Sequence, residues 1–130
     1  MVQLLVCDDS ADVRASLRAL LGELEDVEIV AEAADGEEAV RLALELRPDV
    51  VLMDVSMPVL DGVTTTRRLH ELLPATRIVA FTGADDTDVV MAMREAGASA
   101  YLVKGAPLED PKSWAMTWRA YRRKHGANGR

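Results

Sequence analysis

Short apolar runs alternate with segments of helical periodicity along the first 103 residues of the chain. Most of the runs are continuous in Val, Ile and Leu, which is typical of parallel strands covered on both faces of a sheet. Five such runs predict strands, at residues 3–7, 28–33, 50–53, 77–81 and 100–103. The pattern therefore indicates a repeated strand–helix unit.

The segments between the runs carry apolar residues three and four positions apart, which is the spacing of one face of a helix. In the first segment the repeating residues are Val13, Leu17, Leu20, Leu21 and Leu24. In the second segment they are Ala39, Val40, Ala43, Leu44 and Leu46. We expect each segment to form a helix with its apolar face on the sheet.

Residues with known capping preferences mark the expected helix ends. Asp35 is suited to the start of the second helix, and Pro48 ends that helix. A third helix is expected over residues 64–72, and it is weaker because three consecutive threonines have poor helix propensity. Asp86 is suited to cap a fourth helix, which stops at Gly97.

Strict alternation of strands and helices with short connections implies right-handed crossovers and a parallel sheet with helices on both faces. The predicted fold class is α/β, a doubly wound five-stranded parallel sheet in a flavodoxin-like (βα)5 three-layer sandwich with strand order 2-1-3-4-5. Sheets of this kind bind ligands outside the carboxyl ends of their strands. Functional residues are therefore expected at that edge.

The composition narrows the functional classes. The 130 residues suit one domain, and the formal net charge is −7. Residues 1–110 hold 9 Lys and Arg against 22 Asp and Glu, whereas residues 111–130 hold 6 basic residues and no acidic ones. Because phosphate binding needs clustered basic side chains, we do not expect the acidic body to bind nucleic acid or an anionic membrane.

Three further features favour a cytoplasmic protein in a reducing compartment. The longest apolar run, residues 89–93, is far shorter than the ~18 residues of a membrane span. The N-terminal residues lack the basic leader of a secretory signal. The single cysteine, Cys7, has no second cysteine in the chain to pair with and is expected to be a small buried apolar residue.

Polar side chains stand at the carboxyl ends of four predicted strands. Asp8 and Asp9 follow the first strand, Asp54 the third, Thr82 the fourth and Lys104 the fifth. Each alone is an ordinary helix cap or surface residue, but three converging carboxylates repel one another unless a cation or proton offsets their charge. Mg²⁺ suits such oxygen ligands. With a hydroxyl and an ammonium to bind an anion, the group predicts phosphoryl transfer to an aspartate.

Four segments of the chain resemble one known family. They are the pair Asp8-Asp9, the run Asp-Val-Ser-Met-Pro at 54–58 with Asp61-Gly62 after it, Phe-Thr-Gly at 81–83, and Gly-Ala-Ser-Ala-Tyr-Leu-Val-Lys at 97–104. In this order and at these strand ends they are similar to the receiver domains of two-component response regulators. The resemblance covers about residues 2–109.

The resemblance implies a phosphoacceptor and a metal site. Asp54 would take a phosphoryl group from a sensor histidine kinase. Asp8, Asp9, Asp54 and the backbone carbonyl of Ser56 would hold Mg²⁺. Such a domain catalyses only its own phosphotransfer and dephosphorylation, so we expect a signalling domain and not an enzyme.

The contacts to the phosphoryl group and the switch follow from the same resemblance. Thr82 would hydrogen-bond the phosphoryl group, and Lys104 would pair with it. Tyr101 would be the aromatic switch residue, since its ring can be buried or exposed at modest cost. Phosphorylation is expected to change the face formed by the fourth helix, the fifth strand and the fifth helix. That face would then control an output domain, a homodimer contact or another partner.

The end of the chain departs from the common pattern of the family. Lys104 is followed by Gly105 and Ala106 before Pro107, as in the subgroup usually joined to a helix-turn-helix DNA-binding domain. Only 26 residues follow Lys104, too few for a helix and such a domain. We therefore expect either a stand-alone receiver or a piece of a longer chain.

We divide the chain into a receiver core at residues 1–109, a basic helix at 110–125 and a tail at 126–130. The helix is expected to start near Pro111, where proline is favoured, and to complete the domain. Its aromatic stripe, Trp114, Trp118 and Tyr121, either packs on the sheet or is exposed as a dimer or partner surface.

Three other functions compete with a phosphorylated receiver. A pseudo-receiver adaptor, which works without phosphorylation, does not need the complete set of polar groups. A phosphoaspartyl hydrolase uses an Asp-x-Asp pair, whereas Asp54 is followed by Val55 and Ser56. A flavin mononucleotide carrier would place its phosphate against Asp8 and Asp9. The pseudo-receiver is the alternative that stays open.

Overall fold

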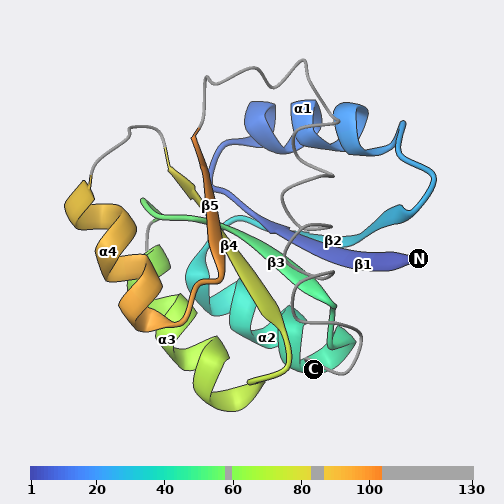
Figure 1. The fold of residues 1–130 in the computed structure, drawn as a ribbon. Helices are drawn as coiled ribbons and strands as arrows, with labels where there is room; N and C mark the ends of the chain where they lie inside the picture. Colours follow the sequence, from blue (N-terminus) through green and yellow to red (C-terminus); the bar gives the residue numbers. More distant parts are fainter. Residues whose placement is uncertain (58–59, 83–86, 104–130) are drawn as a thin grey trace.

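The computed structural model describes residues 1–57, 60–82 and 87–103, which form one sheet and four helices (Figure 1). The strands are β1 (Val2–Cys7), β2 (Val27–Ala33), β3 (Val50–Asp54), β4 (Arg77–Thr82) and β5 (Ala100–Val103). The helices are α1 (Ala11–Leu21), α2 (Gly36–Leu46), α3 (Gly62–Leu72) and α4 (Thr87–Ala96).

All neighbouring strands of the sheet are parallel, and their order is β2-β1-β3-β4-β5. Helix α1 lies on one face of the sheet, and α2, α3 and α4 lie on the other (Figure 1). This arrangement confirms the predicted fold class. The chain reverses its direction of winding between β1 and β3, so the carboxyl ends of these two strands border the crevice where doubly wound sheets bind ligands.

Alternate strand residues fill two apolar cores, one on each face of the sheet. On the α1 face, Leu17 packs in a core that includes Phe81 of β4. On the opposite face, Leu69 of α3 and Met93 of α4 pack in a core that includes Cys7 of β1. Each large side chain buried in this way stabilises the fold by about 1.5–3 kcal/mol. The prediction that Cys7 is a small buried apolar residue is confirmed.

The strand ends match the prediction within one residue. The structure extends β3 to Asp54 and β4 to Thr82, so both candidate site residues are the last residues of their strands. A side chain at such a position keeps the orientation that the sheet imposes on it, whereas a loop residue is less constrained.

Two predictions about the helices are wrong in detail. Helix α3 begins at Gly62 and not at residue 64, because Asp61 caps it by accepting a hydrogen bond from the backbone N–H of Thr64 at 2.8 Å. On α2, Leu44 and Leu46 are 41% and 39% exposed, although their spacing assigned them to the apolar face. Helix α2 ends at Leu46, before Pro48, as predicted.

Other predictions concern residues outside the described part of the chain. They are the Asp86 cap, the basic helix at 110–125 with its aromatic stripe, and the tail at 126–130. Among the helices that the structure describes, none has the length and apolar character needed to cross a membrane.

The cap of α2 can be tested by Asp35→Ala. The Asp35 carboxylate accepts a hydrogen bond from the backbone N–H of Glu38 at 2.9 Å and places a negative charge at the positive end of the helix dipole. We expect the free energy of unfolding, measured in urea, to fall by ~1 kcal/mol. The exposed Glu45→Ala on the same helix is the control and should change it by less than about 0.5 kcal/mol. Equal losses in both variants would argue against a capping role.

Candidate functional site

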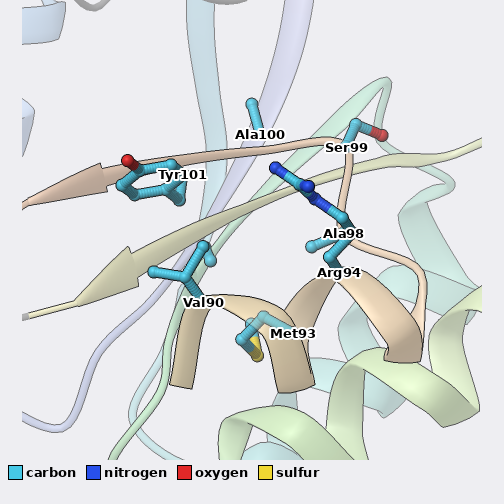
Figure 2. Close-up of a pocket in the computed structure, with 8 residues that line it drawn as sticks. Val90, Met93, Arg94, Ala98, Ser99, Ala100 and Tyr101 are labelled. Atoms are coloured by element: carbon cyan, nitrogen blue, oxygen red, sulfur yellow. The ribbon is translucent and has the colours of Figure 1, made fainter. Parts of the chain in front are cut away.

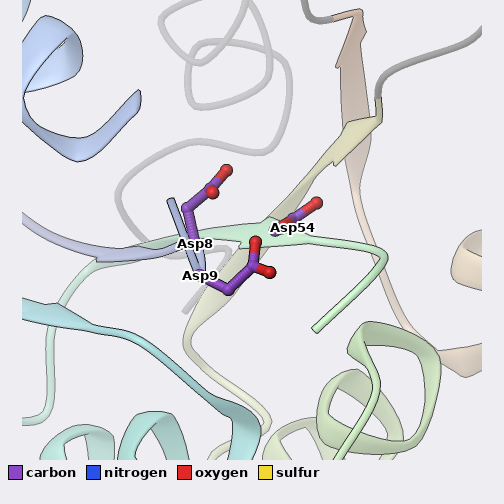
Figure 3. A group of neighbouring side chains, drawn as sticks. All are labelled: Asp8, Asp9 and Asp54. Atoms are coloured by element: carbon purple, nitrogen blue, oxygen red, sulfur yellow. The ribbon is translucent and has the colours of Figure 1, made fainter. Parts of the chain in front are cut away.

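Three aspartates meet at the carboxyl edge of the sheet (Figure 3). Asp8, Asp9 and Asp54 each offer a carboxylate oxygen, and these oxygens lie within 4.8 Å of one another. Asp8 and Asp54 are buried, with 0% and 3% of their surface exposed, whereas Asp9 is exposed. The predicted convergence of the three carboxylates is confirmed, and the exposed Asp9 leaves the cluster open to solvent on one side.

The register of β1 against β3 brings the two buried carboxylates together. Cys7 pairs with Met53, so the residues that follow, Asp8 and Asp54, lie at the same level of the sheet. Asp8 is held further by its backbone N–H, which donates to Ala33 of β2 at 3.0 Å. Its carboxylate Oδ1 accepts a hydrogen bond from the N–H of Ser10 at 2.9 Å, immediately before α1 begins.

Val55, Ser56 and Gly62 make backbone hydrogen bonds close to Asp54 at the end of β3. The backbone N–H of Val55 donates to Phe81 at 3.3 Å, and the N–H of Gly62 donates to the Val55 carbonyl at 2.9 Å. The N–H of Ser56 approaches Asp54 Oδ1 at 3.4 Å. Ser56 is therefore a neighbour of the Asp54 carboxylate, while the role of its carbonyl as a metal ligand stays a prediction.

Gly62 permits this close return of the chain. A Cβ at position 62 would overlap the carbonyl oxygen of Asp54 and would lie 2.7 Å from Cα of Val55. Because the obstructing atoms belong to the backbone, they cannot move aside as a flexible side chain would. The sequence showed Asp61-Gly62 only as turn residues, and the structure shows that they start α3 against the last residue of β3.

Gly62→Ala tests this contact. We expect the added methyl group to push the start of α3 away from Asp54 and to lower the free energy of unfolding by about 1–3 kcal/mol, the usual range for overpacking. Urea denaturation measures the loss. Gly22→Ala is a less suitable control, because a Cβ there would lie 2.8 Å from the Arg18 carbonyl. Arg67→Ala, at an exposed position of the same helix α3, is the better control, and an equal or larger loss there than at Gly62 would contradict the argument.

Thr82 and Tyr101 lie on the neighbouring strands β4 and β5. Thr82 is 5% exposed and ends β4 one residue beyond Phe81, which pairs with Asp54. Tyr101 pairs with Ala80, two residues before Thr82 along β4, and is 41% exposed. Its ring borders a shallow pocket with Val90 and Arg94 of α4 (Figure 2). Lys104, the predicted partner of the phosphoryl group, lies outside the described residues.

Cys7 lies beneath the carboxylates but is not suited to react. Burial raises the pKa of the Cys7 thiol, and the negative charges of Glu38, Asp8 and Asp54 raise it further. The thiol therefore stays protonated at neutral pH and is not suited to act as a nucleophile.

Two arginines of α1 converge on one carboxylate beside the aspartates. Arg14 donates from Nη1 to the backbone carbonyl of Asp8 at 2.6 Å, and its Nε lies 3.3 Å from Glu32 Oε1. Arg18 donates to both oxygens of Glu32, at 2.6 and 2.9 Å. Sequence analysis missed this cluster. The only available signal was the spacing of the two arginines by one helical turn, which does not identify a partner on another strand.

Glu32 makes the stability depend on pH. The hydrogen bond from Arg18 is the main reason why the pKa of Glu32 is lowered, although desolvation opposes it. A carboxyl whose pKa is lower in the folded state stabilises the fold above its unfolded pKa of about 4.3, and this contribution is lost as the pH falls through the folded value. Urea denaturation between about pH 6 and pH 3 should therefore show a shallower acid loss for Glu32→Gln than for the unmodified chain. Identical slopes would contradict the prediction.

Comparison with known proteins places this site in a family. Residues 4–112 match the response regulator receiver domain. Response regulator GacA of Pseudomonas aeruginosa is 39% identical over 85% of this chain and 51% of its own length. Transcriptional regulatory protein LiaR of Bacillus subtilis is 43% identical over 80% of this chain and 49% of its own. A two-component response regulator of the LuxR family from Aurantimonas has a crystal structure with a TM-score of 0.85 and 34% identity, over 93% of this chain and 84% of that one.

The fold and the family match thus define a signalling domain of the α/β class, of the kind that works through phosphorylation. The chain belongs to the response regulator receiver domains of two-component systems, because the family match spans most of its length. It covers about half the length of GacA and of LiaR.

Proposed function

We propose that this domain receives a phosphoryl group on Asp54 from a phosphohistidine of a sensor histidine kinase. The observation that carries the proposal is the convergence of Asp8, Asp9 and Asp54 within 4.8 Å at the carboxyl edge of the sheet. Asp54 is the suitable nucleophile, because its single carboxylate ends a central strand, whereas Asp8 and Asp9 form an adjacent pair beside it (Figure 3). The phosphorylation-independent pseudo-receiver is the alternative.

The donor set fits Mg²⁺. All three groups are hard oxygen ligands, and two of them are buried, where mutual repulsion is least screened. We propose that Asp8, Asp9, Asp54 and the Ser56 carbonyl hold the ion. When bound, Mg²⁺ offsets the negative charge that would keep a phosphoryl group away from a carboxylate.

The transfer itself is a displacement at phosphorus. A carboxylate oxygen of Asp54 forms the new P–O bond while the P–N bond of the phosphohistidine breaks, and the electron pair leaves with the imidazole nitrogen, which takes up a proton. The Thr82 hydroxyl and the Lys104 ammonium are proposed to bind the phosphoryl oxygens. The nearby N–H of Ser56 restrains the orientation of the Asp54 carboxylate. Hydrolysis of the acyl phosphate by water returns the domain to its initial state.

The proposed switch joins Thr82 to Tyr101 across adjacent strands. In the described state Tyr101 is exposed beside the pocket between α4 and β5 (Figure 2). If the phosphoryl group draws the Thr82 hydroxyl toward it, the Tyr101 ring can move inward and change the surface that α4 and β5 present. Together with the predicted helix at 110–125, this surface is the proposed site for a homodimer contact or another partner.

The output is proposed to be transcriptional. LiaR is a transcriptional regulatory protein, and the two sequences are 43% identical over a match that covers 80% of this chain. The acidic receiver core at 1–109 is not proposed to touch nucleic acid itself. Control would pass instead through a partner or a further domain, with the helix at 110–125 and the tail at 126–130 as the connection. A cytoplasmic location is part of this proposal, because the phosphodonor and the regulated genes are there.

Asp54→Asn tests the phosphoacceptor. Incubation with Mg²⁺ and acetyl phosphate should add one phosphoryl group to the unmodified chain, which intact-mass spectrometry detects, and the variant should show none. Removal of Mg²⁺ by a chelator should slow labelling by at least about 10²-fold, the scale of a metal-assisted step. The exposed Asp12→Asn on α1 is the matched control and should be labelled normally.

Two outcomes would contradict the proposal. Labelling of Asp54→Asn at the normal rate would move the phosphoacceptor elsewhere. Failure of the unmodified chain to be labelled by acetyl phosphate or to bind beryllofluoride with Mg²⁺ would favour the pseudo-receiver.

A further inference from the structure

Arg14 connects the metal-binding end of β1 to an ion pair at the end of β2. Its guanidinium donates to the main-chain carbonyl of Asp8 at 2.6 Å and lies 3.3 Å from Glu32. The Arg14 side chain is only 19% exposed, so the contact is largely shielded from water. Arg14 therefore binds the peptide group of Asp8, whose carbonyl carbon is bonded directly to the Cα that carries the buried side chain.

Glu32 is itself fixed on two sides. Arg18 holds both of its oxygens in a two-point hydrogen bond, at 2.6 and 2.9 Å, and Arg14 approaches Oε1 from the preceding turn of α1. The Arg14 guanidinium also has two contacts, to Asp8 and to Glu32. A planar guanidinium bound at two points has little freedom to rotate, whereas the ammonium of a lysine lacks this planar fork. Glu32 therefore orients Arg14, and Arg14 in turn restrains the backbone at Asp8.

We propose that Arg14 is a positioning residue for the Mg²⁺ and phosphoryl site, with Glu32 as its support. It keeps the Asp8 peptide in the orientation that aims the Asp8 carboxylate at Asp9 and Asp54. This inference rests on the proposed function, because it assigns Arg14 a role in the same site.

Arg14 has two opposite effects on the affinity of the site for Mg²⁺, so the effect of its substitution tests the proposal. As a positive charge near the site, Arg14 disfavours a divalent cation, so its removal alone would tighten Mg²⁺ binding. As a restraint on Asp8, it favours binding, because groups that orient metal ligands typically contribute about 10–100-fold to metal affinity or activity. The proposal holds that the restraint is the larger effect.

The test measures the Mg²⁺ dissociation constant by isothermal titration calorimetry for two variants. Arg14→Lys keeps the charge but loses the planar fork, and Arg14→Gln loses both. We expect both to raise the dissociation constant by roughly tenfold. The Mg²⁺ concentration for half-maximal labelling by acetyl phosphate should rise in parallel, while labelling at saturating Mg²⁺ stays closer to normal. Glu32→Gln should give a smaller rise.

Arg41→Gln is the matched control. Arg41 is an exposed arginine of α2, and the two acidic residues that it pairs with, Glu38 at 3.7 Å and Glu45 at 3.8 Å, lie on the same helix. Its substitution should leave the Mg²⁺ dissociation constant unchanged. Urea denaturation of every variant separates a loss of stability from a loss of affinity.

Four results would overturn the inference. Tighter binding in Arg14→Gln with normal binding in Arg14→Lys would show that only the charge matters. Lower stability with an unchanged dissociation constant in both would show that Arg14 is merely structural. If the unmodified chain neither binds Mg²⁺ nor is labelled, the proposed function and this inference are both overturned. If the unmodified chain and both Arg14 variants bind Mg²⁺ and are labelled normally, only this inference is overturned.

Discussion

Mutual repulsion among three aspartates is the constraint on which the rest of this structure depends. Asp8 and Asp54 are held together almost wholly out of water, where like charges interact strongly. The parallel pairing of β1 with β3 imposes this proximity, because Cys7 lies opposite Met53 and the next residue on each chain carries a carboxylate. The two apolar cores on either face of the sheet supply the stabilisation that keeps these strands paired.

The site has a rigid part and an exposed part, and the division follows from the fold. Around the carboxylates, backbone hydrogen bonds tie the start of α1 to Asp8 and the start of α3 to Val55. Tyr101, by contrast, lies on β5, the last strand of the described sheet, and is 41% exposed. The hydrogen-bonded carboxylates and the exposed Tyr101 therefore lie in different parts of one small domain.

The sequence was informative where each residue's environment depends on local pattern. Continuous apolar runs identified all five strands within one residue at each end, and Asp8, Asp9 and Asp54 were identifiable because strand ends share one edge of the sheet. It failed where the decisive contact is distant in sequence. The close approach of Gly62 to Asp54 and the pairing of Arg14 with Glu32 depend on the register of separate elements, which periodicity does not encode. The exposure of Leu44 and Leu46 shows that apolar spacing also overstates the buried face.

The buried pair Asp8 and Asp54 also has a consequence for evolution. A sequence that evolved to remove this repulsion would relieve an unfavourable electrostatic contribution to the fold, but it would also lose the carboxylates that we propose to bind Mg²⁺. The two cores then determine how much internal strain the domain tolerates. The stability that offsets the repulsion therefore comes in part from residues as remote from the carboxylates as Leu17 and Leu69, although neither side chain belongs to the cluster.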